Sequence, residues 1–384
     1  MRILIAHSFY RDPGGEDTYV RAQAELLEAR HSIEVLGPRN DELSRGEALN
    51  RLVYSGKMRA QIEETIERFR PDVVHLHNAY PSLGPAVHMA IRRRRVPLVM
   101  TVHNLRLRCP NGLMFTEGEL CRRCEGGMYI HAALHRCFPT RRQGVAYAGA
   151  LWLHRFVLRS EREVSLFVAP SRFMASRLHE WGISIDKIKV VRNFVSAAPD
   201  PQRPPGEYGL FLGRLSSEKG VDVLLRALAA ASNPPFRIAG SGPAAERLRD
   251  QALHLGLSKT RFLGLVAHGA VPELLAGSRY VVAPSIWEEN LPLSVLEAMA
   301  AGRAVIGSRR GGLPELVEAA RGIAVEPGDE RGLAAAILKL SRDGVLCDTF
   351  GSAARRFADE ELSPGTHLDK LDSVYHRVVG APAP

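Results

Sequence analysis

The sequence predicts an α/β protein with two doubly wound parallel-sheet domains. Three observations lead to this prediction. A chain of 384 residues is long for one hydrophobic core and comfortable for two domains of ordinary size. Short apolar runs typical of buried strands alternate with helix-length segments in both halves of the chain. A proline-dense stretch, 196–206, separates the halves, and it can continue neither a helix nor a central strand.

The composition is that of a soluble globular protein, with 45% hydrophobic and 24% charged residues. The apolar run at the N-terminus stops too early for a signal peptide, and the apolar stretch 145–153 is too short to span a bilayer. We therefore expect a cytoplasmic protein.

The charge is unevenly distributed along the chain. Residues 1–198 hold 30 Lys and Arg against 20 Asp and Glu, whereas residues 199–384 hold 21 against 22. A basic first half is suited to an acidic substrate, an anionic lipid surface or nucleic acid, and Arg92–Arg95 is its densest patch. Few aromatic residues accompany that patch, which counts against stacking on single-stranded nucleic acid.

In the first half, strands are predicted at 2–6, 33–36, 72–76, 97–102, 166–169 and 188–191. Gly14 and Gly15 follow the first strand and permit close backbone approach at a helix N-terminus, which suits a phosphate. The dinucleotide-binding Gly-x-Gly-x-x-Gly pattern does not follow. His75 and His77 end the third strand, and His103 ends the fourth. We interpret His75 as an ordinary buried histidine.

Four cysteines lie in an irregular segment rich in glycine and proline. They are Cys109, Cys121, Cys124 and Cys137, with the spacing Cys-x11-Cys-x2-Cys-x12-Cys. In a reducing cytosol this pattern favours a structural zinc site over disulfides, with His135 as a substitute ligand. Free thiols, an oxidisable pair and an iron–sulfur cluster are the alternatives.

The segment 144–159 is predicted to be helical, with Trp152 and Phe156 among its bulky residues. Packing against the first sheet is the favoured interpretation, and a membrane-facing apolar stripe is the alternative.

The second half begins with a strand, 208–212, followed by Gly213-Arg-Leu-Ser-Ser-Glu-Lys-Gly220 before a helix. This loop lacks the Gly-Lys-Ser/Thr of a phosphate-binding P-loop.

The most informative stretch is Pro284-Ser-Ile-Trp-Glu-Glu-Asn-Leu-Pro-Leu-Ser-Val-Leu-Glu-Ala-Met-Ala-Ala-Gly302. Pro292 suits a first helical turn and Gly302 a helix end. Glu289 is therefore expected in a loop at the carboxyl end of a strand and Glu297 in the following helix. Ligands of open parallel sheets bind at this edge, so two carboxylates here predict a hydroxyl-rich, partly anionic guest. The alternative is a surface loop with solvated acids followed by a core helix.

Three of these segments resemble motifs of retaining glycosyltransferases of family 4, which have the GT-B fold. The segments are the Pro284–Gly302 stretch with its two glutamates, the Gly213–Gly220 loop and the Thr101–Asn104 turn. The segment with the four cysteines resembles an insertion found on the acceptor side in a subset of that family. The resemblance covers most of the chain and is closer in its second half.

This resemblance implies two Rossmann-like domains that face a central cleft. Residues 1–197 would form the acceptor-side domain, with the cysteine-containing insertion at about 105–140. Residues 207–360 would bind the nucleotide sugar, and the last helix, about 364–379, would pack back on the first domain.

The resemblance also implies roles for individual residues. Arg214 and Lys219 would hold the donor diphosphate, and Glu297 the ribose. His103 and Glu289 would lie beside the transferred sugar. The other residues expected to contact the donor are Gly14, Gly15, Asn290 and Leu291.

We therefore predict a retaining hexosyltransferase that moves a sugar from a UDP- or GDP-linked donor to a hydroxyl group, in polysaccharide or glycolipid synthesis. The acceptor would be a saccharide or a lipid-linked molecule, with peripheral contact to the anionic inner face of the membrane and no nucleic-acid partner. Because no Asp-x-Asp occurs in the chain, protein cations rather than a catalytic divalent metal are expected to hold the diphosphate.

Two alternatives remain at this point. A zinc-containing nucleic-acid-binding protein would explain the basic half and the cysteines, but it leaves Glu289 and Glu297 unused. A sugar-nucleotide epimerase would share the GT-B fold and differ in chemistry.

Overall fold

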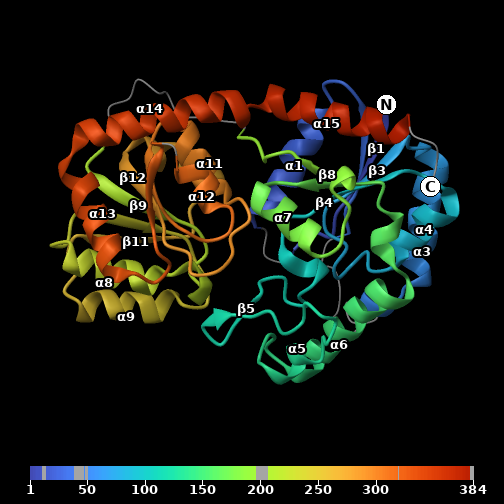
Figure 1. Cartoon of the computed structure of the whole chain (residues 1–384), viewed down its shortest axis with the longest axis horizontal. Coiled ribbons are helices and arrows are strands. Elements are labelled where there is room, and N and C mark those ends of the chain that lie inside the picture. The colour runs from blue at the N-terminus through green and yellow to red at the C-terminus, as the bar shows by residue number, and fades with distance from the viewer. Residues whose placement is uncertain (11–13, 39–46, 48–50, 196–205, 319, 381–384) are drawn as a thin grey trace. The chain divides into compact units, whose positions relative to one another are not determined.

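The computed structural model describes all residues except 11–13, 39–46, 48–50, 196–205, 319 and 381–384 (Figure 1). The chain divides into two compact units, and the predicted linker and the C-terminal tail lie largely outside the described residues. Unit 1 comprises Met1–Val191 and His367–Pro384, and unit 2 comprises Arg192–Thr366. Within the described ranges, every helix is too short or too polar to traverse a lipid bilayer.

Unit 1 is built on a six-stranded parallel sheet with the order β2-β1-β3-β4-β7-β8. Its strands are β1 (Arg2–Ala6), β2 (Ser32–Leu36), β3 (Val73–Leu76), β4 (Leu98–Thr101), β7 (Leu166–Ala169) and β8 (Ile188–Val190). Its principal helices are α1 (Gly15–Leu27), α3 (Gly56–Phe69), α4 (Ala86–Arg94), α6 (Arg141–Trp152), α7 (Arg172–Glu180) and α15 (Pro364–Val379). All four residues of β3 and of β7 are buried, as is typical of a parallel sheet covered on both faces.

The final helix, α15, is tied to unit 1 by side chains far away in sequence. Tyr375 is fully buried, and its hydroxyl lies 2.7 Å from His75 Nδ1. At the exposed side of the helix, Arg30 donates to Asp369 and Asp372, each at 2.7 Å. The last helix of the chain therefore belongs structurally to the first unit.

Unit 2 has a second six-stranded parallel sheet with the order β11-β10-β9-β12-β13-β14. Its strands are β9 (Tyr208–Leu212), β10 (Phe236–Ala239), β11 (Thr260–Gly264), β12 (Ser278–Ala283), β13 (Ala304–Ser308) and β14 (Gly322–Val325). Its helices are α8 (Val221–Ala230), α9 (Ala245–His254), α10 (Val271–Ala276), α11 (Leu293–Ala300), α12 (Leu313–Val317), α13 (Glu330–Arg342) and α14 (Gly344–Glu361).

Alternation along the central strand β12 shows why unit 2 has a core on each side of its sheet. Tyr280 and Val282 pack in one hydrophobic cluster with α8, α9 and α13, whereas Val281 packs in another with α10, α11, α12 and α14. Successive strand side chains point to opposite faces, so an unbroken apolar run supplies both layers. The prediction of two doubly wound parallel-sheet domains is confirmed.

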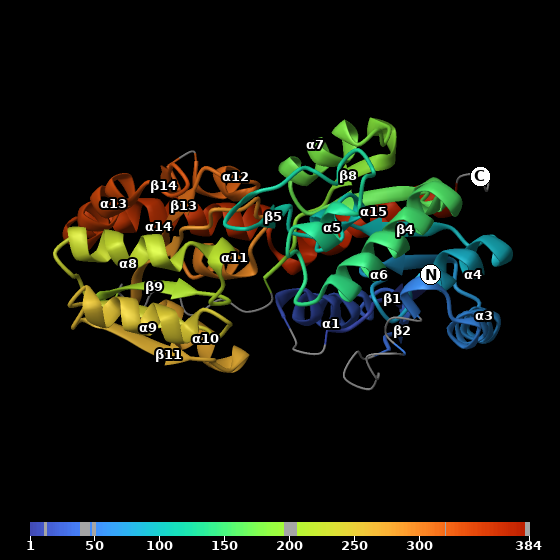
Figure 2. The same cartoon turned by 90° about the horizontal axis from the view of Figure 1, so that it is seen from below.

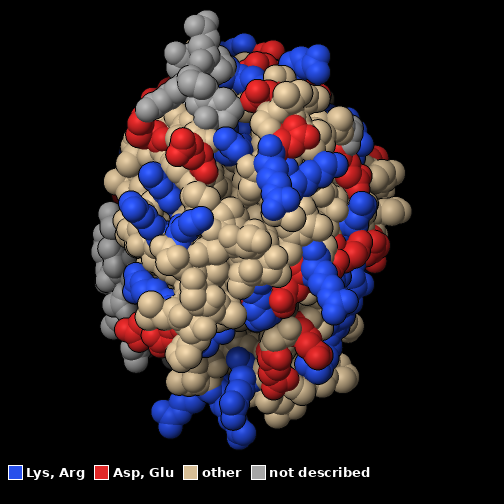
Figure 3. All heavy atoms as spheres, turned by 90° about the vertical axis from the view of Figure 1, so that its left-hand side faces the viewer, with Lys and Arg blue, Asp and Glu red and all other residues tan. Residues whose placement is uncertain are grey.

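Surface charge in unit 2 is mixed, as its nearly balanced composition predicts. Figure 3 views the side on which α8, α9 and α13 lie in Figure 1, and it shows basic and acidic side chains interspersed.

One predicted helix, 144–159, differs in the structure. Helix α6 begins earlier, at Arg141, and ends at Trp152, and a π-helical turn over Leu153–Val157 follows it. Arg159 then adopts a left-handed conformation with φ of +50°, which ends the helical run. Figure 2 shows α6 beside the short helix α5 (His131–Leu134).

The bulky residues of this segment were expected to pack against the first sheet, and two of them do not. Leu151 is buried, but Trp152 and Phe156 are 51% and 43% exposed. Small side chains at Gly144 and Ala148 form the buried stripe with Leu151, so the bulkiest residues are left facing outward.

Candidate active site

Two loops of unit 2 meet at the carboxyl ends of β9 and β12. The backbone N–H of Ile286 donates to the carbonyl of Glu218 at 3.0 Å. Gly220 has a φ of +67°, and a Cβ there would lie 2.1 Å from the carbonyl oxygen of Pro284. Only glycine permits this approach, which explains the glycine that ends the Arg214–Lys219 loop.

Lys219 and Glu289 are the central pair of this site. Lys219 Nζ lies 2.5 Å from Glu289 Oε1, and the Ser285 hydroxyl donates to the same oxygen at 2.7 Å. Glu289 is only 6% exposed, and the ammonium group also lies 5.3 Å from the centre of the Trp287 ring. A buried carboxylate is thus held by a charge-assisted bond between loops 70 residues apart.

The backbone of Glu289 is held as firmly as its side chain. Its carbonyl accepts from the N–H of Gly312 at 2.7 Å. Gly311 has a φ of +60°, and a Cβ there would lie 2.0 Å from the same carbonyl oxygen. The glycine pair after β13 therefore positions the glutamate before any ligand arrives.

Arg214 and Glu297 differ from this pair in having no ion-pair partner among the described residues. Arg214 is exposed in the loop after β9. Glu297 lies in α11, where burial raises the pKa of its carboxyl group to about 7. Each side chain is thus available to a charged or hydrogen-bonding ligand.

The two residues that follow Glu289 are buried. Asn290 is 9% exposed, and Leu291 packs in the hydrophobic cluster formed with α10 and α11. Contact between Leu291 and a ligand would therefore involve its backbone rather than its side chain.

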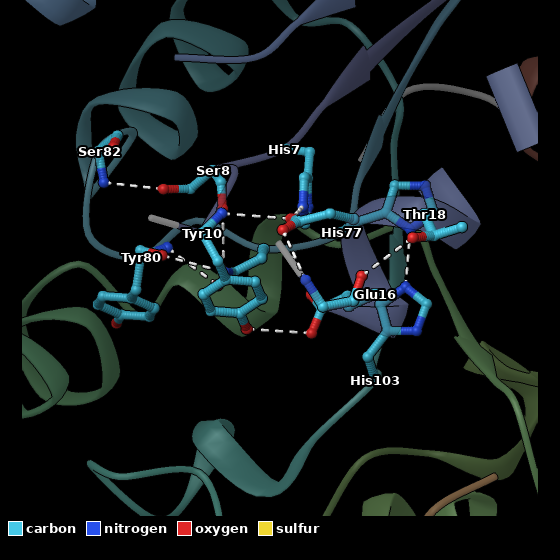
Figure 4. Close-up of polar contacts among 12 residues, drawn as sticks. His7, Ser8, Tyr10, Glu16, Thr18, His77, Tyr80, Ser82 and His103 are labelled. Carbon is cyan, nitrogen blue, oxygen red and sulfur yellow. Dashed lines mark hydrogen bonds and ion pairs between the residues drawn. The ribbon is translucent and has the colours of Figure 1, made fainter. Parts of the chain in front are cut away.

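Unit 1 contributes a cluster of histidines at the carboxyl ends of neighbouring strands (Figure 4). His77 Nδ1 and His103 Nε2 lie 2.8 Å apart, so one ring donates its N–H to the other. His75 stacks on His77 with ring centres 4.3 Å apart, and it also contacts Thr101 Oγ1 at 2.7 Å. His75 thus forms the inner end of the cluster and has hydrogen-bond partners for both ring nitrogens.

Burial keeps these imidazoles neutral at physiological pH. It lowers the pKa of His103 to about 4 and that of His75 to about 3, and it holds the pKa of His77 well below its ordinary value. A neutral imidazole can donate and accept hydrogen bonds with sugar hydroxyls, but it offers no positive charge. His77 Nε2 is enclosed and has no hydrogen-bond partner within the described ranges.

A second group in this unit is centred on His7 and Asp17. Asp17 stands where the resembled family has the acidic residue of its Gly-Gly-x-acid loop, whereas sequence reasoning missed its partner His7. His7 follows β1, and its Nε2 lies 2.8 Å from Asp17 Oδ1. The same carboxylate accepts the backbone N–H groups of Tyr10 and Gly14, each at 3.2 Å. Asp17 is 2% exposed, and it holds the backbone of Tyr10 and Gly14 close to the start of α1. The signal in the sequence was the position of His7 immediately after a strand.

Glu16, in the first turn of α1, presents a more accessible carboxylate than Asp17. It accepts the Tyr10 hydroxyl at 3.0 Å and the Asn104 amide at 3.4 Å. Gly14, in contrast, is exposed, and a Cβ there would meet nothing within 4 Å. Gly14 donates its N–H to Asp17, so that N–H is not free for a phosphate. Gly15 is the first residue of helix α1.

The four cysteines line one small pocket, together with His131. Cys109 donates its thiol to Asn111 Oδ1 at 2.9 Å, and burial raises the pKa of Cys124 to about 12. Over the described parts of the chain, no three Cys, His, Asp or Glu side chains are close enough to hold a metal ion. The predicted zinc site is therefore not supported by this arrangement.

The fold and these sites define a two-domain enzyme of the GT-B class, and comparison with known proteins identifies its family. Residues 13–198 match the family described as Glycosyltransferase Family 4, and residues 200–357 match Glycosyl transferases group 1. The chain belongs to this group of glycosyltransferases.

Two relatives match along most of the chain. Glycogen synthase of Mycobacterium tuberculosis is 31% identical over 349 residues, which cover 88% of this chain and 76% of that protein. Phosphatidyl-myo-inositol mannosyltransferase of Mycobacterium leprae is 28% identical over 369 residues, with 92% and 91% covered.

Solved structures support the fold. Anabaena HepE in complex with UDP and glucose superposes with a TM-score of 0.70 at 20% identity, covering 98% of this chain and all of that one. Sucrose-phosphate synthase from Thermosynechococcus elongatus gives a TM-score of 0.73 at 17% identity, with both chains fully covered. Family membership decides between the transferase and the nucleic-acid-binding alternative in favour of the transferase.

Proposed function

We propose that this enzyme transfers a sugar from a nucleoside diphosphate sugar to an acceptor hydroxyl with retention of the anomeric configuration. The observation that carries the proposal is the preorganised Lys219–Glu289 pair, which lies at the ligand-binding edge of the unit 2 sheet. The UDP bound to HepE supports a nucleotide-linked donor. We infer that the nucleoside diphosphate of the donor is UDP or GDP.

The reaction requires stabilisation of a leaving diphosphate. The bond between the anomeric carbon and the diphosphate oxygen breaks, and the nucleoside diphosphate leaves with the electron pair. The acceptor oxygen forms the new bond and loses its proton. In our proposal, Arg214 and Lys219 stabilise the charge that develops on the diphosphate. Arg214 is suited to this role because none of its described contacts is an ion pair.

We assign the remaining side chains as the resemblance to family 4 glycosyltransferases implies. Glu297 binds the ribose hydroxyls, and Glu289 and the neutral His103 bind the transferred sugar. Gly14, Gly15, Asn290 and Leu291 border the donor, with the N–H of Gly14 already held by Asp17. The positions of Glu289 and His103 after parallel strands are compatible with these roles.

The experiment that tests the reaction is product analysis by NMR after incubation with UDP- and GDP-linked hexoses. Thermal-shift screening with UDP, GDP and ADP selects the donor base first. We expect transfer with the donor's own anomeric configuration in the product. Inversion would contradict the retaining mechanism, and a changed hexose formed without any acceptor would indicate an epimerase.

We further propose that the acceptor is presented at an anionic membrane surface, and that residues 128–157 make the contact. Their exposed hydrophobic side chains are Met128, Ile130, Leu134, Val145, Trp152, Phe156 and Val157. Val145, Gly149, Trp152 and Phe156 follow one side of the α6 helical run, and Arg141 and Arg142 are exposed at its start. An apolar stripe beside basic residues is typical of interfacial helices.

This surface replaces Arg92–Arg95 as the main candidate. Arg92, Arg93 and Arg94 each lie within 4.0 Å of a glutamate carboxylate, so the basic patch is partly neutralised by its own unit. The contact proposed here therefore depends on apolar insertion as well as charge.

We also propose that the four cysteines bind a structural zinc ion. What supports this is their spacing in the sequence; all four border one pocket, but in the described structure no three of them are close enough to hold one metal ion. Such an ion would draw the thiolates together and order residues 105–140.

A further inference from the structure

Unit 1 contains a cavity beside His103 that the proposed donor contacts leave unused. It lies where β3 and β4 end, and the segment from Leu151 to Val164 covers it. Much of its wall is apolar, formed by Ala79, Met100, Val102, Leu107, Leu151 and Val164. His103 and Asn104 form part of the same wall, so the cavity is continuous with the histidine cluster.

Arg106 reaches this cavity from the short 3-10 helix over Leu105–Leu107, which Asn104 caps by accepting the Arg106 backbone N–H at 3.1 Å. The Arg106 guanidinium Nε is enclosed and finds no hydrogen-bond acceptor among the described residues. Among the described residues, no carboxylate lies within ion-pair distance of Arg106. Placing a cation in a partly apolar cavity without a counter-charge is unfavourable.

Neighbouring arginines show that this state is particular to Arg106. Arg108, two residues further on, makes a bidentate ion pair with Glu161 and also donates to the carbonyl of Trp181. Arg155, which also lines the cavity, donates to the carbonyl of Glu125 and to the Tyr129 hydroxyl.

The nearby carboxylates already have partners. Glu161 borders the cavity, but its two oxygens accept from Arg108. Glu16 accepts from Tyr10 and Asn104 through Oε2, and its Oε1 has no hydrogen-bond partner among the described residues. It interacts electrostatically with Arg106 at longer range but forms no direct ion pair with it. The Arg106 guanidinium can therefore still take a direct anionic partner that is not part of the protein.

Two buried histidines add further unused polar atoms. His88 and His154 line the cavity and are 6% and 5% exposed. In the described part of the chain, His88 Nδ1 and His154 Nε2 have no hydrogen-bond partner, whereas His154 Nδ1 contacts the Ser160 hydroxyl at 3.2 Å. Buried polar atoms without partners are costly, and they are explained most simply by a ligand that supplies polar atoms.

We propose that this cavity binds an anionic group of the acceptor, with the Arg106 guanidinium as its counter-charge and the apolar wall against a hydrocarbon part. The proposal rests on the proposed function, because it names the acceptor class of the same transferase. The acceptor is then an amphiphilic phosphate or carboxylate, and its anionic group lies beside His103.

The test uses isothermal titration calorimetry on the full chain with three probes that share one alkyl chain. These are n-octyl phosphate, octanoate and the neutral n-octyl glucoside, each below its micelle concentration. We expect the wild type to bind an anionic probe at least tenfold more tightly than the neutral one. The preferred anion distinguishes a phosphorylated from a carboxylated acceptor.

Variants then test the residue. Arg106→Gln is expected to weaken binding of the preferred anion at least tenfold, and Arg106→Lys to restore part of it. Arg95→Gln removes the same charge from an exposed position of the same unit and should change binding less than twofold. The melting temperature of Arg106→Gln should change little, because among the described residues the variant removes no ion pair and only a long contact of 6.0 Å with the Tyr80 ring.

Separate measurements distinguish the possible failures. Binding of UDP or GDP, followed in parallel, should be the same in wild type and Arg106→Gln. If nucleotide binds but the anionic probes do not, or if they bind Arg106→Gln as tightly as wild type, the anion subsite is wrong. If neither UDP nor GDP binds, the proposed function fails whatever the probes show.

Discussion

Replacing Lys219 tests the central pair of the proposed active site. In Lys219→Ala the diphosphate loses a fixed cation, and loss of one preorganised donor typically costs about 3 kcal/mol of transition-state stabilisation. That corresponds to a fall in kcat of roughly 100- to 200-fold. Glu289 also loses its ion-pair partner and keeps the Ser285 hydroxyl alone, although it is only 6% exposed.

The loss of that partner makes a second, separable contribution. A buried carboxylate whose partner is removed typically costs about 3 kcal/mol of folding stability. Glu289→Gln removes the charge, so the double variant Lys219→Ala/Glu289→Gln should recover stability relative to Lys219→Ala while remaining slow. The two effects are therefore separated by one double-mutant cycle.

The assay combines initial rates at saturating donor with chemical denaturation. Lys339→Ala, which removes an exposed lysine from α13 of the same unit, serves as the matched control and should leave both quantities nearly unchanged. A folded Lys219→Ala enzyme with kcat within fivefold of wild type would refute the role of this residue. Additive stability losses in the double variant would show that the ion pair carries no coupling energy.

Four further outcomes are expected. Arg214→Ala should lower kcat by a factor similar to that of Lys219→Ala. Brief treatment of the wild type with EDTA should leave the rate nearly unchanged. If activity is lost on chelation and returns when Mg²⁺ or Mn²⁺ is added, protein cations alone do not hold the diphosphate. Burial raises the pKa of Glu297 to about 7, above its unfolded value, so folding stability should fall as pH rises from about 4.5 to 7, by an amount on the order of 3 kcal/mol. Glu297→Gln should abolish that fall in stability when urea denaturation is measured across this pH range. Calorimetry should show weaker binding of UDP or GDP to Glu297→Gln, whereas Glu289→Gln should bind nucleotide normally and turn over slowly. The reverse order would mean that the two roles are exchanged. Phosphatidylglycerol vesicles should capture the wild type in flotation at low salt. Trp152→Ser and Phe156→Ser should weaken this capture, whereas Leu265→Ser, which changes an 81% exposed residue of unit 2, should not. No capture of the wild type would point to an acceptor free in solution. Metal analysis of protein purified without chelator should find close to one zinc per chain. Cys124→Ser should speed amide hydrogen exchange in residues 105–140 without changing nucleotide binding. Absence of metal together with four freely reactive thiols would exclude the zinc site.

Much of the fold could be predicted from local chemistry. Unbroken apolar runs such as Tyr280-Val-Val-Ala indicated strands covered on both faces, and the helix expected after Pro292 ends before Gly302, which has a φ of +66°. The positions of Glu289 and Glu297 followed from the same reasoning, because a loop after a parallel strand lies at the ligand-binding edge. These features depend on residues close together in the sequence.

Other features were decided only in the tertiary structure. The stacked imidazoles of His75, His77 and His103 come together because β3 and β4 are neighbours in the sheet, although 26 residues separate His77 from His103. Their lowered pKa values depend on the exclusion of water by distant segments, including Tyr375 at the end of the chain. Residue spacing in the local sequence does not predict which distant segments will exclude water from these histidines.

The same reason explains the exposed Trp152 and the unpaired Arg106. Residue spacing along α6 shows which side chains share a face, but what covers that face is set by packing of other elements. The sequence likewise shows an arginine at 106 and another at 108, yet only the fold brings Glu161 to Arg108 and leaves Arg106 beside an apolar cavity. Local spacing determined the elements and their loops, whereas burial and charge pairing, which depend on contacts between distant residues, were decided by the tertiary structure.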